Sequence, residues 1–489
     1  LKPVIDQAVK RCYNILQQEN RNISDEQKKK FEMKKELTRR NLLKTLGLAT
    51  GGLLSIPLQG FGETNISLHI PNSLKYPAPD KPVTAITLGA GNRGNVYGDY
   101  AVKYPNHLNI VGVAEPIEIR NDRYCQKHNI PIENSFVTWE DVFKRTKFAE
   151  AIIITTPDNL HFGPCMKALS MGYDILLEKP IAPTEKECRD ILSLAKESKR
   201  IVAVCHVLRY SPYFIKLREL IQNGSIGELI SIQHFEPIQH IHMSHSYVRG
   251  NWHNSKATTP IILAKSCHDL DILRWMVGKS CEKISAFGDL SWFKKENMPT
   301  GATPRCVDGC TIEKECPYSA LKIYYKDRQR THVFDLPEDE SKHGDAILDR
   351  LKTTNYGRCV YQMDNDQPDH YTTNLQFSNG VTAAFSMEAF TSYEGRRTRV
   401  MGSHGDIVGD MSQFVHTNFL TGEKTEWKLT SDAHGGGDWN LVSDWIQAVS
   451  KQNSDLLSSS IDVSVESHII GFTAEKSRLG EKTEKVSLQ

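Results

Sequence analysis

The stretch that decides the fold is residues 83–94, which read VTAITLGAGNRG. A short β-branched run leads directly into a Gly-x-Gly-x-x-Gly pattern, and residues 95–104 are predicted to form the helix that follows. The first glycine permits a tight turn, the second lets a pyrophosphate approach the backbone, and the third lets the helix pack close to the strand. The residues of this turn predicted to bind a dinucleotide are Gly89, Gly91, Asn92, Arg93 and Gly94.

An acidic residue ends the next predicted strand. Residues 109–114 (NIVGVA) lead to Glu115, about 20 residues beyond the glycines. A carboxylate here accepts hydrogen bonds from the adenosine ribose hydroxyls and repels a 2′-phosphate, so the sequence favours NAD over NADP. Arg120 stands nearby and would soften that preference.

Strands and helices then alternate, which is typical of a doubly wound parallel sheet. Strands are predicted over residues 151–155, 174–177 and 201–205, and each is followed by polar residues. Because ligands of such sheets bind beyond the carboxyl ends of the strands, these residues are expected around one crevice. The candidates for cofactor binding are Asn159, His161, Glu178, Lys179 and His206. The sequence thus predicts an α/β Rossmann domain over residues 83–206.

The second half, residues 207–489, has the character of an α+β domain. Residues 374–385 (NLQFSNGVTAAF) alternate apolar and polar side chains around Asn379-Gly380, which predicts a β-hairpin. Further strands are expected over residues 229–235, 283–287 and 398–401. Helices are expected over residues 269–277, 438–449 and 463–482.

Several motifs together resemble one family. They are GAGNRG (89–94), TTPDNLH (155–161), GYDILLEKP (172–180), NGSIGE (223–228) and HDLD (268–271). Over residues 83–480 the chain resembles the Gfo/Idh/MocA family of glucose–fructose oxidoreductases and inositol dehydrogenases. The resemblance implies a Rossmann domain, then a domain whose open, mostly antiparallel sheet forms the substrate wall. It also implies a tightly held nicotinamide cofactor, a sugar-like or polyol-like substrate, and a homodimer or homotetramer.

The resemblance places Lys179 and His268 at the reacting carbon. Oxidation of a carbinol needs a group that takes the hydroxyl proton, and in family terms the lysine bonds the hydroxyl while the histidine relays the proton. Many members carry an aspartate four residues before this histidine, where this chain has Ala264. We therefore expect Lys265 to replace that aspartate, or the site to perform different chemistry.

Residues 234–253 hold five of the chain's 18 histidines, together with an arginine and aromatic residues. Such a mixture suits carbohydrate binding, because aromatic faces stack on sugar rings while polar side chains bond hydroxyls. The predicted substrate contacts are His245, Tyr247, Arg249 and Trp252. Alternatives are a metal site formed by the imidazoles at positions 240, 242 and 245, or an exposed polar loop. We favour substrate binding for this segment and predict no metal site.

Three cysteines, Cys306, Cys310 and Cys316, lie within 11 residues, and Cys359 follows later in the chain. Four thiolates can hold a structural Zn²⁺, and two disulfides fit equally well in an oxidising compartment. We expect a structural role of either kind.

The N-terminal residues do not have the pattern of a folded domain. Residues 1–32 are polar and charged and are interpreted as a leader that is disordered or not part of the native protein. Residues 33–62 place Arg39-Arg40 before an apolar run, which resembles a twin-arginine export signal and predicts a periplasmic location. Residues 63–82 are interpreted as a linker.

Composition excludes two classes of partner. The chain of 489 residues has 60 Lys and Arg against 59 Asp and Glu, a net charge of +1, which gives no electrostatic case for nucleic-acid binding. The longest apolar run, residues 42–58, contains a lysine, three glycines and a proline, so no integral membrane span is expected.

Two functions follow. The first is an NAD-dependent oxidoreductase acting on a secondary hydroxyl of a sugar or glycoside, with its cofactor tightly bound. The alternative is an NAD-dependent, redox-neutral glycosidase. In that reaction transient oxidation of a ring hydroxyl acidifies the neighbouring C–H, the aglycone leaves by elimination, water adds and the ketone is reduced again.

Overall fold

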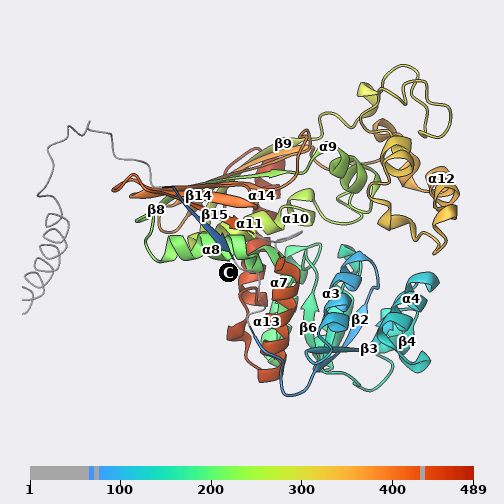
Figure 1. Cartoon of the computed structure of the whole chain (residues 1–489), viewed down its shortest axis with the longest axis horizontal. Coiled ribbons are helices and arrows are strands. Elements are labelled where there is room, and N and C mark those ends of the chain that lie inside the picture. The colour runs from blue at the N-terminus through green and yellow to red at the C-terminus, as the bar shows by residue number, and fades with distance from the viewer. Residues whose placement is uncertain (1–64, 71–75, 430–435, 489) are drawn as a thin grey trace, which may run out of the picture. The chain divides into compact units, whose positions relative to one another are not determined.

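Two sheets organise the chain. The computed structural model describes residues 65–70, 76–429 and 436–488, so the predicted leader (1–32) and export signal (33–62) lie outside the described residues. Residues 63–489 cluster as one unit (Figure 1). No helix in the described part of the chain has the length and apolarity to cross a bilayer.

The first sheet has six parallel strands with the fingerprint strand near its middle. Its spatial order is β4 (Ser135–Phe136), β3 (Leu108–Ala114), β2 (Val83–Leu88), β5 (Ala151–Ile154), β6 (Asp174–Leu177) and β7 (Val202–Val204). Its helices are α3 (Asn92–Lys103), α4 (Glu118–His128), α5 (Trp139–Val142), α6 (Phe162–Ser170) and α7 (Glu185–Ser198). The order reverses between β2 and β5, which confirms the doubly wound sheet and places a ligand crevice at that reversal.

Helix α3 begins at Asn92, earlier than the sequence indicates, because Gly91 is its N-cap. The first turn of the helix therefore lies inside the fingerprint, with its free N–H groups at the turn. Helix α7 begins at a reciprocal capping box: Thr184 accepts a hydrogen bond from the Glu187 backbone, and the Glu187 side chain accepts one from the Thr184 backbone.

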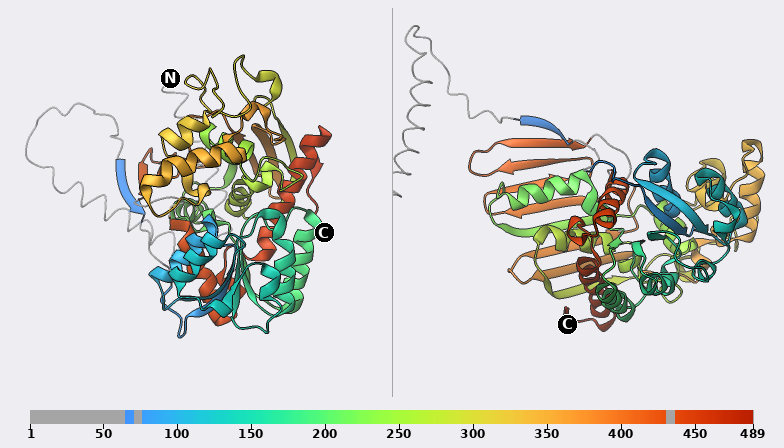
Figure 2. Two further views of the ribbon diagram at one scale, coloured as in Figure 1. Left: turned by 90° about the vertical axis from the view of Figure 1, so that its right-hand side faces the viewer. Right: turned by 90° about the horizontal axis from the view of Figure 1, so that it is seen from below.

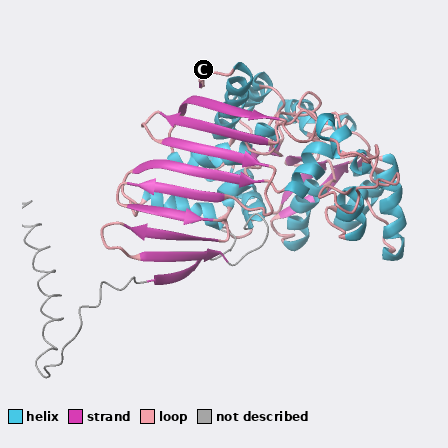
Figure 3. Ribbon diagram, turned by 90° about the horizontal axis from the view of Figure 1, so that it is seen from above, coloured by secondary structure: helices cyan, strands magenta, loops and turns pink. Residues whose placement is uncertain are grey.

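The second sheet has ten strands and is mostly antiparallel, as predicted (Figure 3). Its order is β1 (Asn65–Ile70), β15 (Lys424–Leu429), β14 (Gln413–Asn418), β13 (Gly405–Gly409), β12 (Arg397–Gly402), β8 (Leu229–Pro237), β11 (Thr382–Glu388), β10 (His370–Phe377), β9 (Cys281–Asp289) and β16 (Glu484–Lys485). Only the β8–β11 and β1–β15 pairs are parallel among the described strands. The predicted hairpin is β10–β11, and Gly380 takes the positive φ of 84° that its turn requires.

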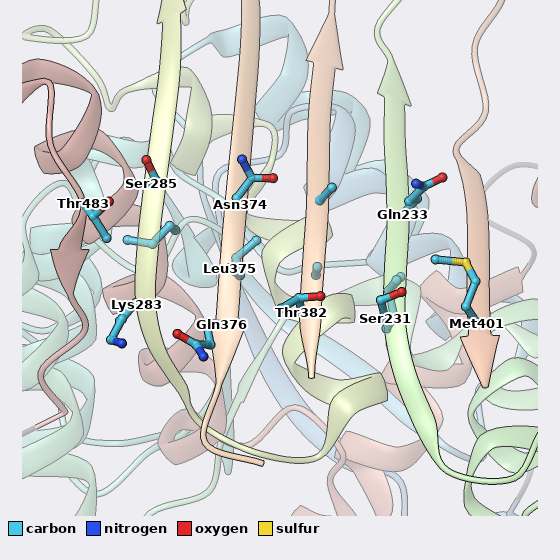
Figure 4. Close-up of a pocket in the computed structure, with 14 residues that line it drawn as sticks. Ser231, Gln233, Lys283, Ser285, Asn374, Leu375, Gln376, Thr382, Met401 and Thr483 are labelled. Carbon is cyan, nitrogen blue, oxygen red and sulfur yellow. The ribbon is translucent and has the colours of Figure 1, made fainter. Parts of the chain in front are cut away.

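Helices cover one face of this sheet and leave the other uncovered. The covering helices are α8 (Pro212–Gln222), α10 (Ile261–Ala264), α11 (Cys267–Val277) and α14 (Ile461–Gly480). Burial alternates along β10 from Tyr371 to Phe377, so every second side chain enters the core. Figure 3 looks onto the uncovered face, and Figure 4 shows the polar side chains along it, such as Gln233, Asn374 and Gln376.

Helix α13 (Gly437–Lys451) packs on the first sheet although it follows the second in sequence. Leu441, Trp445 and Ile446 are fully buried in the same cluster as Val83 and Ala85. The prediction assigned all of residues 207–489 to the second domain, but the structure uses this helix to complete the core of the first. Burial of a large apolar face explains the placement.

Residues 290–369, here called the insertion, separate β9 from β10. They contain α12 (His343–Thr353) and short helical turns around a small core of their own, which includes Tyr324, Phe334 and Leu351. The insertion lies beside α4 of the first domain (Figures 1 and 2). The sequence analysis did not predict this unit.

Candidate active site

The glycine turn has the shape that a dinucleotide needs. Gly89 has a φ of +95°, and a Cβ there would lie 2.7 Å from the carbonyl oxygen of Thr155. A Cβ at Gly94 would collide with the carbonyl oxygen of Gly89. A Cβ at Gly91, in contrast, would meet only Arg120 Nη1, at 3.9 Å. The backbone is thus open above Gly91, where a pyrophosphate would lie against the N-terminus of α3.

Glu115 lies beside this turn at the carboxyl end of β3. Its Oε2 accepts a 2.7 Å hydrogen bond from the Ala90 backbone and its Oε1 a 3.0 Å bond from the Ile117 backbone. These donors hold the buried carboxylate at the edge of the turn. The open backbone at Gly91 and the fixed carboxylate of Glu115 therefore fit the phosphate and ribose groups of an adenosine dinucleotide. Asn92 is the first residue of α3, and Asn159 is exposed at the turn after β5.

Two predicted cofactor ligands instead brace the protein. The Arg93 side chain donates to Glu178 Oε1 at 2.6 Å and reaches Asp438 Oδ1 at 2.5 Å. Glu178 Oε1 also accepts from Tyr97 at 2.6 Å. The Arg93 guanidinium and the carboxylates of Glu178 and Asp438 neutralise one another. The Arg93–Glu178 pair also joins the glycine turn to the loop after β6.

The predicted histidines at the strand ends also contact protein groups. Both ring nitrogens of His161 face backbone carbonyls, Pro180 at 2.7 Å and Thr156 at 2.9 Å, so this ring joins two loops. The His206 ring is fully buried and lies 6.0 Å from the His268 ring and 5.4 Å from the His468 ring, measured between centroids. His206 thus lies beside His268, the predicted proton relay, and beside His468.

Lys179 extends from the carboxyl end of β6 to the second domain. Its ammonium group donates a 2.8 Å hydrogen bond to the carbonyl of Ala264, the last residue of α10. His268 follows in the first turn of α11. The structure therefore brings Lys179 to the segment that contains Lys265 and His268.

Lys265 belongs to a buried network of charges. Its Nζ lies 3.1 Å from Glu236 Oε1, and Arg396 Nη2 lies 2.9 Å from Glu236 Oε2. Arg396 also pairs with Asp269 at 2.5 Å. Burial by itself would raise the pKa of Asp269, but the Arg396 guanidinium and His234 outweigh it and lower that pKa to about 2. Directly after Ala264, this chain thus carries a lysine that pairs with a buried glutamate.

Aromatic rings gather around Tyr247 in the second domain. The Tyr247 ring lies 6.0 Å from the rings of Trp252 and His242. Trp252 Nε1 donates to Asp158 Oδ2 at 2.8 Å. Burial raises the pKa of Asp158, and the nearby charges of His161 and Lys179 oppose that rise. Tyr247 is buried and Trp252 is half-buried, so Trp252 is the ring of this pair that keeps accessible surface.

Sequence reasoning missed three charged groups of this crevice, namely Asp158, Glu236 and Arg396. Asp158 precedes the predicted Asn159 and follows a parallel strand, so its position was the available signal. Glu236 belongs to β8 and Arg396 directly precedes β12, and no local pattern joins them.

Two predicted substrate contacts belong to another environment. Arg249 donates to the carbonyls of Arg358 and Tyr318, each at 2.8 Å, and is buried against the insertion. His245 bonds the Tyr324 hydroxyl at 2.8 Å and stacks on Tyr356, also in the insertion. Both side chains therefore bond groups of the insertion in this structure.

The cysteine cluster lines a small cavity together with Arg249. Cys306, Cys310, Cys316 and Cys359 are all free thiols in the structure. Among residues 65–70, 76–429 and 436–488, no three His, Cys, Asp or Glu side chains are arranged to hold a metal ion. Burial raises the pKa of Cys316 and of Cys359. The four cysteines thus lie together around the buried Arg249 side chain.

The buried histidines predict a pH effect on stability. Burial lowers the pKa of His206 to about 4 and of His468 to about 3, against an ordinary value of 6.5. Between pH 7 and 5 the unfolded chain binds protons that the folded chain does not. The free energy of unfolding should therefore decrease as the pH is lowered, by up to about 1.4 kcal/mol per pH unit for each histidine. Urea denaturation at several pH values measures this, and His468→Gln should flatten the dependence; an unchanged slope in that variant would contradict the assignment.

The comparisons with known proteins agree with this geometry. Residues 84–206 match the model of the oxidoreductase family's NAD-binding Rossmann fold, and residues 218–462 match the model of its C-terminal alpha/beta domain. These matches cover most of the chain, so it belongs to the Gfo/Idh/MocA family of oxidoreductases.

Individual relatives are distant. The oxidoreductase YteT of Bacillus subtilis (strain 168) is 24% identical over 364 residues, 70% of this chain and 83% of YteT. Inositol 2-dehydrogenase of Corynebacterium glutamicum (strain R) is 26% identical over 192 residues, 39% of this chain and 53% of that protein. Levoglucosan dehydrogenase, solved with NADH and L-sorbose, superposes with a TM-score of 0.62 at 15% identity, over 83% of this chain and 99% of its own. The inositol 2-dehydrogenase and two further curated relatives are matched over only 44–53% of their own length.

Proposed function

We propose that this protein is an NAD-dependent oxidoreductase that oxidises or reduces a secondary hydroxyl of a sugar or glycoside while holding its cofactor tightly. The observation that carries the proposal is the 2.8 Å bond from Lys179 Nζ to the Ala264 carbonyl. It holds the Lys179 ammonium group at the segment that directly precedes His268. Related proteins that are named inositol 2-dehydrogenase and levoglucosan dehydrogenase support the substrate class.

The reaction requires a path for one proton. When bound, the nicotinamide exchanges a hydride with the carbinol carbon. Lys179 would donate a hydrogen bond to the reacting oxygen and stabilise its alkoxide character, since only one of its N–H groups is used by Ala264. His268 would then take the proton, and Asp158 would orient the sugar through Trp252.

Glu115 supports NAD over NADP, because a carboxylate fixed beside the glycine turn would accept hydrogen bonds from ribose hydroxyls and repel a 2′-phosphate. If residues 33–62 act as the predicted export signal, the periplasm would supply little free cofactor. The cofactor would then have to arrive bound and be regenerated in place.

The second candidate is the redox-neutral glycosidase. The pairing of Lys265 with the buried Glu236, at 3.1 Å, favours it, because elimination of an aglycone needs one more acid or base near the ring. A relative from Escherichia coli (strain K12), 26% identical over 148 residues, is named 2,7-anhydro-N-acetylneuraminate hydratase. The word hydratase denotes an enzyme that adds water.

One assay separates the two. Purified protein is incubated with a panel of monosaccharides and p-nitrophenyl glycosides, and the products are followed by mass spectrometry. Loss or gain of two hydrogens supports the oxidoreductase. Release of nitrophenol with no net change in NADH supports the glycosidase.

The uncovered face of the second sheet is proposed to join two copies of the chain. Phe287 on β9 is 61% exposed on this face, among polar neighbours such as Lys283 and Ser285. We expect a dimer or tetramer by size-exclusion chromatography with light scattering. Phe287→Asp should shift the population to monomer, because a charge would be buried without a partner. Ile132→Asp, at an 85% exposed position of the first domain, is the matched control and should leave the mass unchanged.

A further inference from the structure

An ion pair connects the insertion to the mouth of the cofactor site. Asp335 accepts two hydrogen bonds from Arg120, from Nε at 2.7 Å and from Nη2 at 2.9 Å. Arg120 belongs to α4 of the first domain, so the pair joins residues 215 positions apart in the chain. The remaining nitrogen, Nη1, is the atom that lies 3.9 Å from a Cβ placed on Gly91. The guanidinium therefore lies directly beside the phosphate turn and close to Glu115.

The insertion presents Asp335 in a defined position. Asp335 ends a short helical turn, Thr331–Phe334, with a φ of 49°. Phe334, just before it, is 2% exposed in the core of the insertion. The carbonyl of Leu336, just after it, accepts a 2.9 Å bond from Arg123 of α4. Anchors on both sides thus hold the Asp335 carboxylate against Arg120.

The chemistry of the pair bears on which dinucleotide can bind. A 2′-phosphate carries a charge of about −2 near neutral pH, and a free arginine fork beside the adenosine ribose would bind it with two parallel hydrogen bonds. Asp335 uses two of the three nitrogens of that fork and cancels its charge. It also adds a second carboxylate to the one that Glu115 already places there.

We propose that Asp335 makes this site select NAD over NADP, an inference that rests on the cofactor assignment of the proposed function. Arg120 by itself would favour the 2′-phosphate. The insertion reverses that preference from a position far away in sequence.

The test is the affinity of the full-length protein for the two nucleotides. NAD⁺ and NADP⁺ are titrated against protein-bound NADH, and displacement is followed by NADH fluorescence. In Asp335→Asn the ratio of NADP⁺ to NAD⁺ affinity should rise by about tenfold or more, because the guanidinium is freed to pair with phosphate. Adding Arg120→Ala to this variant should remove the gain. Asp339→Asn is the matched control, since Asp339 lies in the same insertion and bonds Ser341 and Lys342 instead.

Three outcomes would overturn the proposal. An unchanged affinity ratio in Asp335→Asn, with an unchanged circular dichroism spectrum, would show that Asp335 only holds the insertion. A gain that persists without Arg120 would show that the fork plays no part. A wild-type protein that binds neither nucleotide would refute the cofactor assignment itself, and this result is distinct from the first two.

Discussion

Replacing Lys179 with methionine is expected to lower kcat by about three orders of magnitude while the protein keeps its cofactor. Methionine matches the length of the side chain but cannot hydrogen-bond the reacting oxygen or the Ala264 carbonyl. The glycine turn and Glu115, which are proposed to bind the adenosine half, do not involve the Lys179 side chain. The measurements are the initial rate with the substrate identified by mass spectrometry and the NADH fluorescence of the same sample.

Lys186→Met is the control for this experiment. The Lys186 side chain is 83% exposed on α7 and pairs with the neighbouring Asp190. The initial rate of the Lys186→Met variant should therefore equal that of the wild type. A Lys179→Met enzyme that retains most of its activity would remove Lys179 from the reaction. Loss of bound cofactor from this variant would instead mean that the lysine acts in binding.

Replacing Asp271 with asparagine is expected to cost about 3–5 kcal/mol of folding stability. Asp271 accepts two 2.6 Å hydrogen bonds from Arg209, and a third from Ser467 at the same distance. Arg209 is 2% exposed and Asp271 is 1% exposed. Removal of the carboxylate leaves the guanidinium buried without a counter-charge. Guanidinium chloride denaturation followed by tryptophan fluorescence measures the loss.

Two further variants show whether the effect comes from the unpaired charge. Arg209→Met combined with Asp271→Leu removes both ions and should be more stable than Asp271→Asn alone. Asp190→Asn removes a carboxylate from the surface pair with Lys186 and should change stability by less than about 1 kcal/mol. Equal losses in the buried and surface variants would falsify the charge-burial account.

The position of Asp271 shows what a motif can and cannot say. The sequence His268-Asp-Leu-Asp271 pointed to the family and to a site near Lys179, and the structure places His268 there. Asp271 lies three residues further along the same side of α11, where it pairs with Arg209 and its Oδ1 lies 3.7 Å from His206 Nε2. The spacing of three residues therefore combines a proposed proton carrier with a structural ion pair.

Local patterns predicted the secondary structure of the first domain well because its parallel strands are buried on both faces. Such strands are short apolar runs bounded by glycine and polar residues, and they can be recognised without knowledge of their neighbours. The Asn379-Gly380 hairpin was predictable for a similar reason, since its turn residues act within a few positions of the strands they join.

The charged network of the crevice could not be predicted in the same way. Lys265, Glu236 and Arg396 come from three elements that are distant in the chain, and each sequence position by itself resembles an ordinary surface charge. The same is true of Arg249 and His245. Their histidine-rich and arginine-rich segment suggested a sugar site, but two of its side chains pack against an insertion that sequence patterns had not revealed.

The sequence by itself determined the Rossmann strand and turn, the candidate cofactor acid Glu115, the lysine at the end of β6 and the antiparallel character of the second half. These features depend on backbone geometry and hydrophobic periodicity over a few residues. Only the tertiary structure decided which partner each charged side chain meets: the Ala264 carbonyl for Lys179, Glu236 for Lys265, and Asp335 for Arg120. The interaction between two buried charges depends on their distance in space, and separation along the chain does not determine that distance.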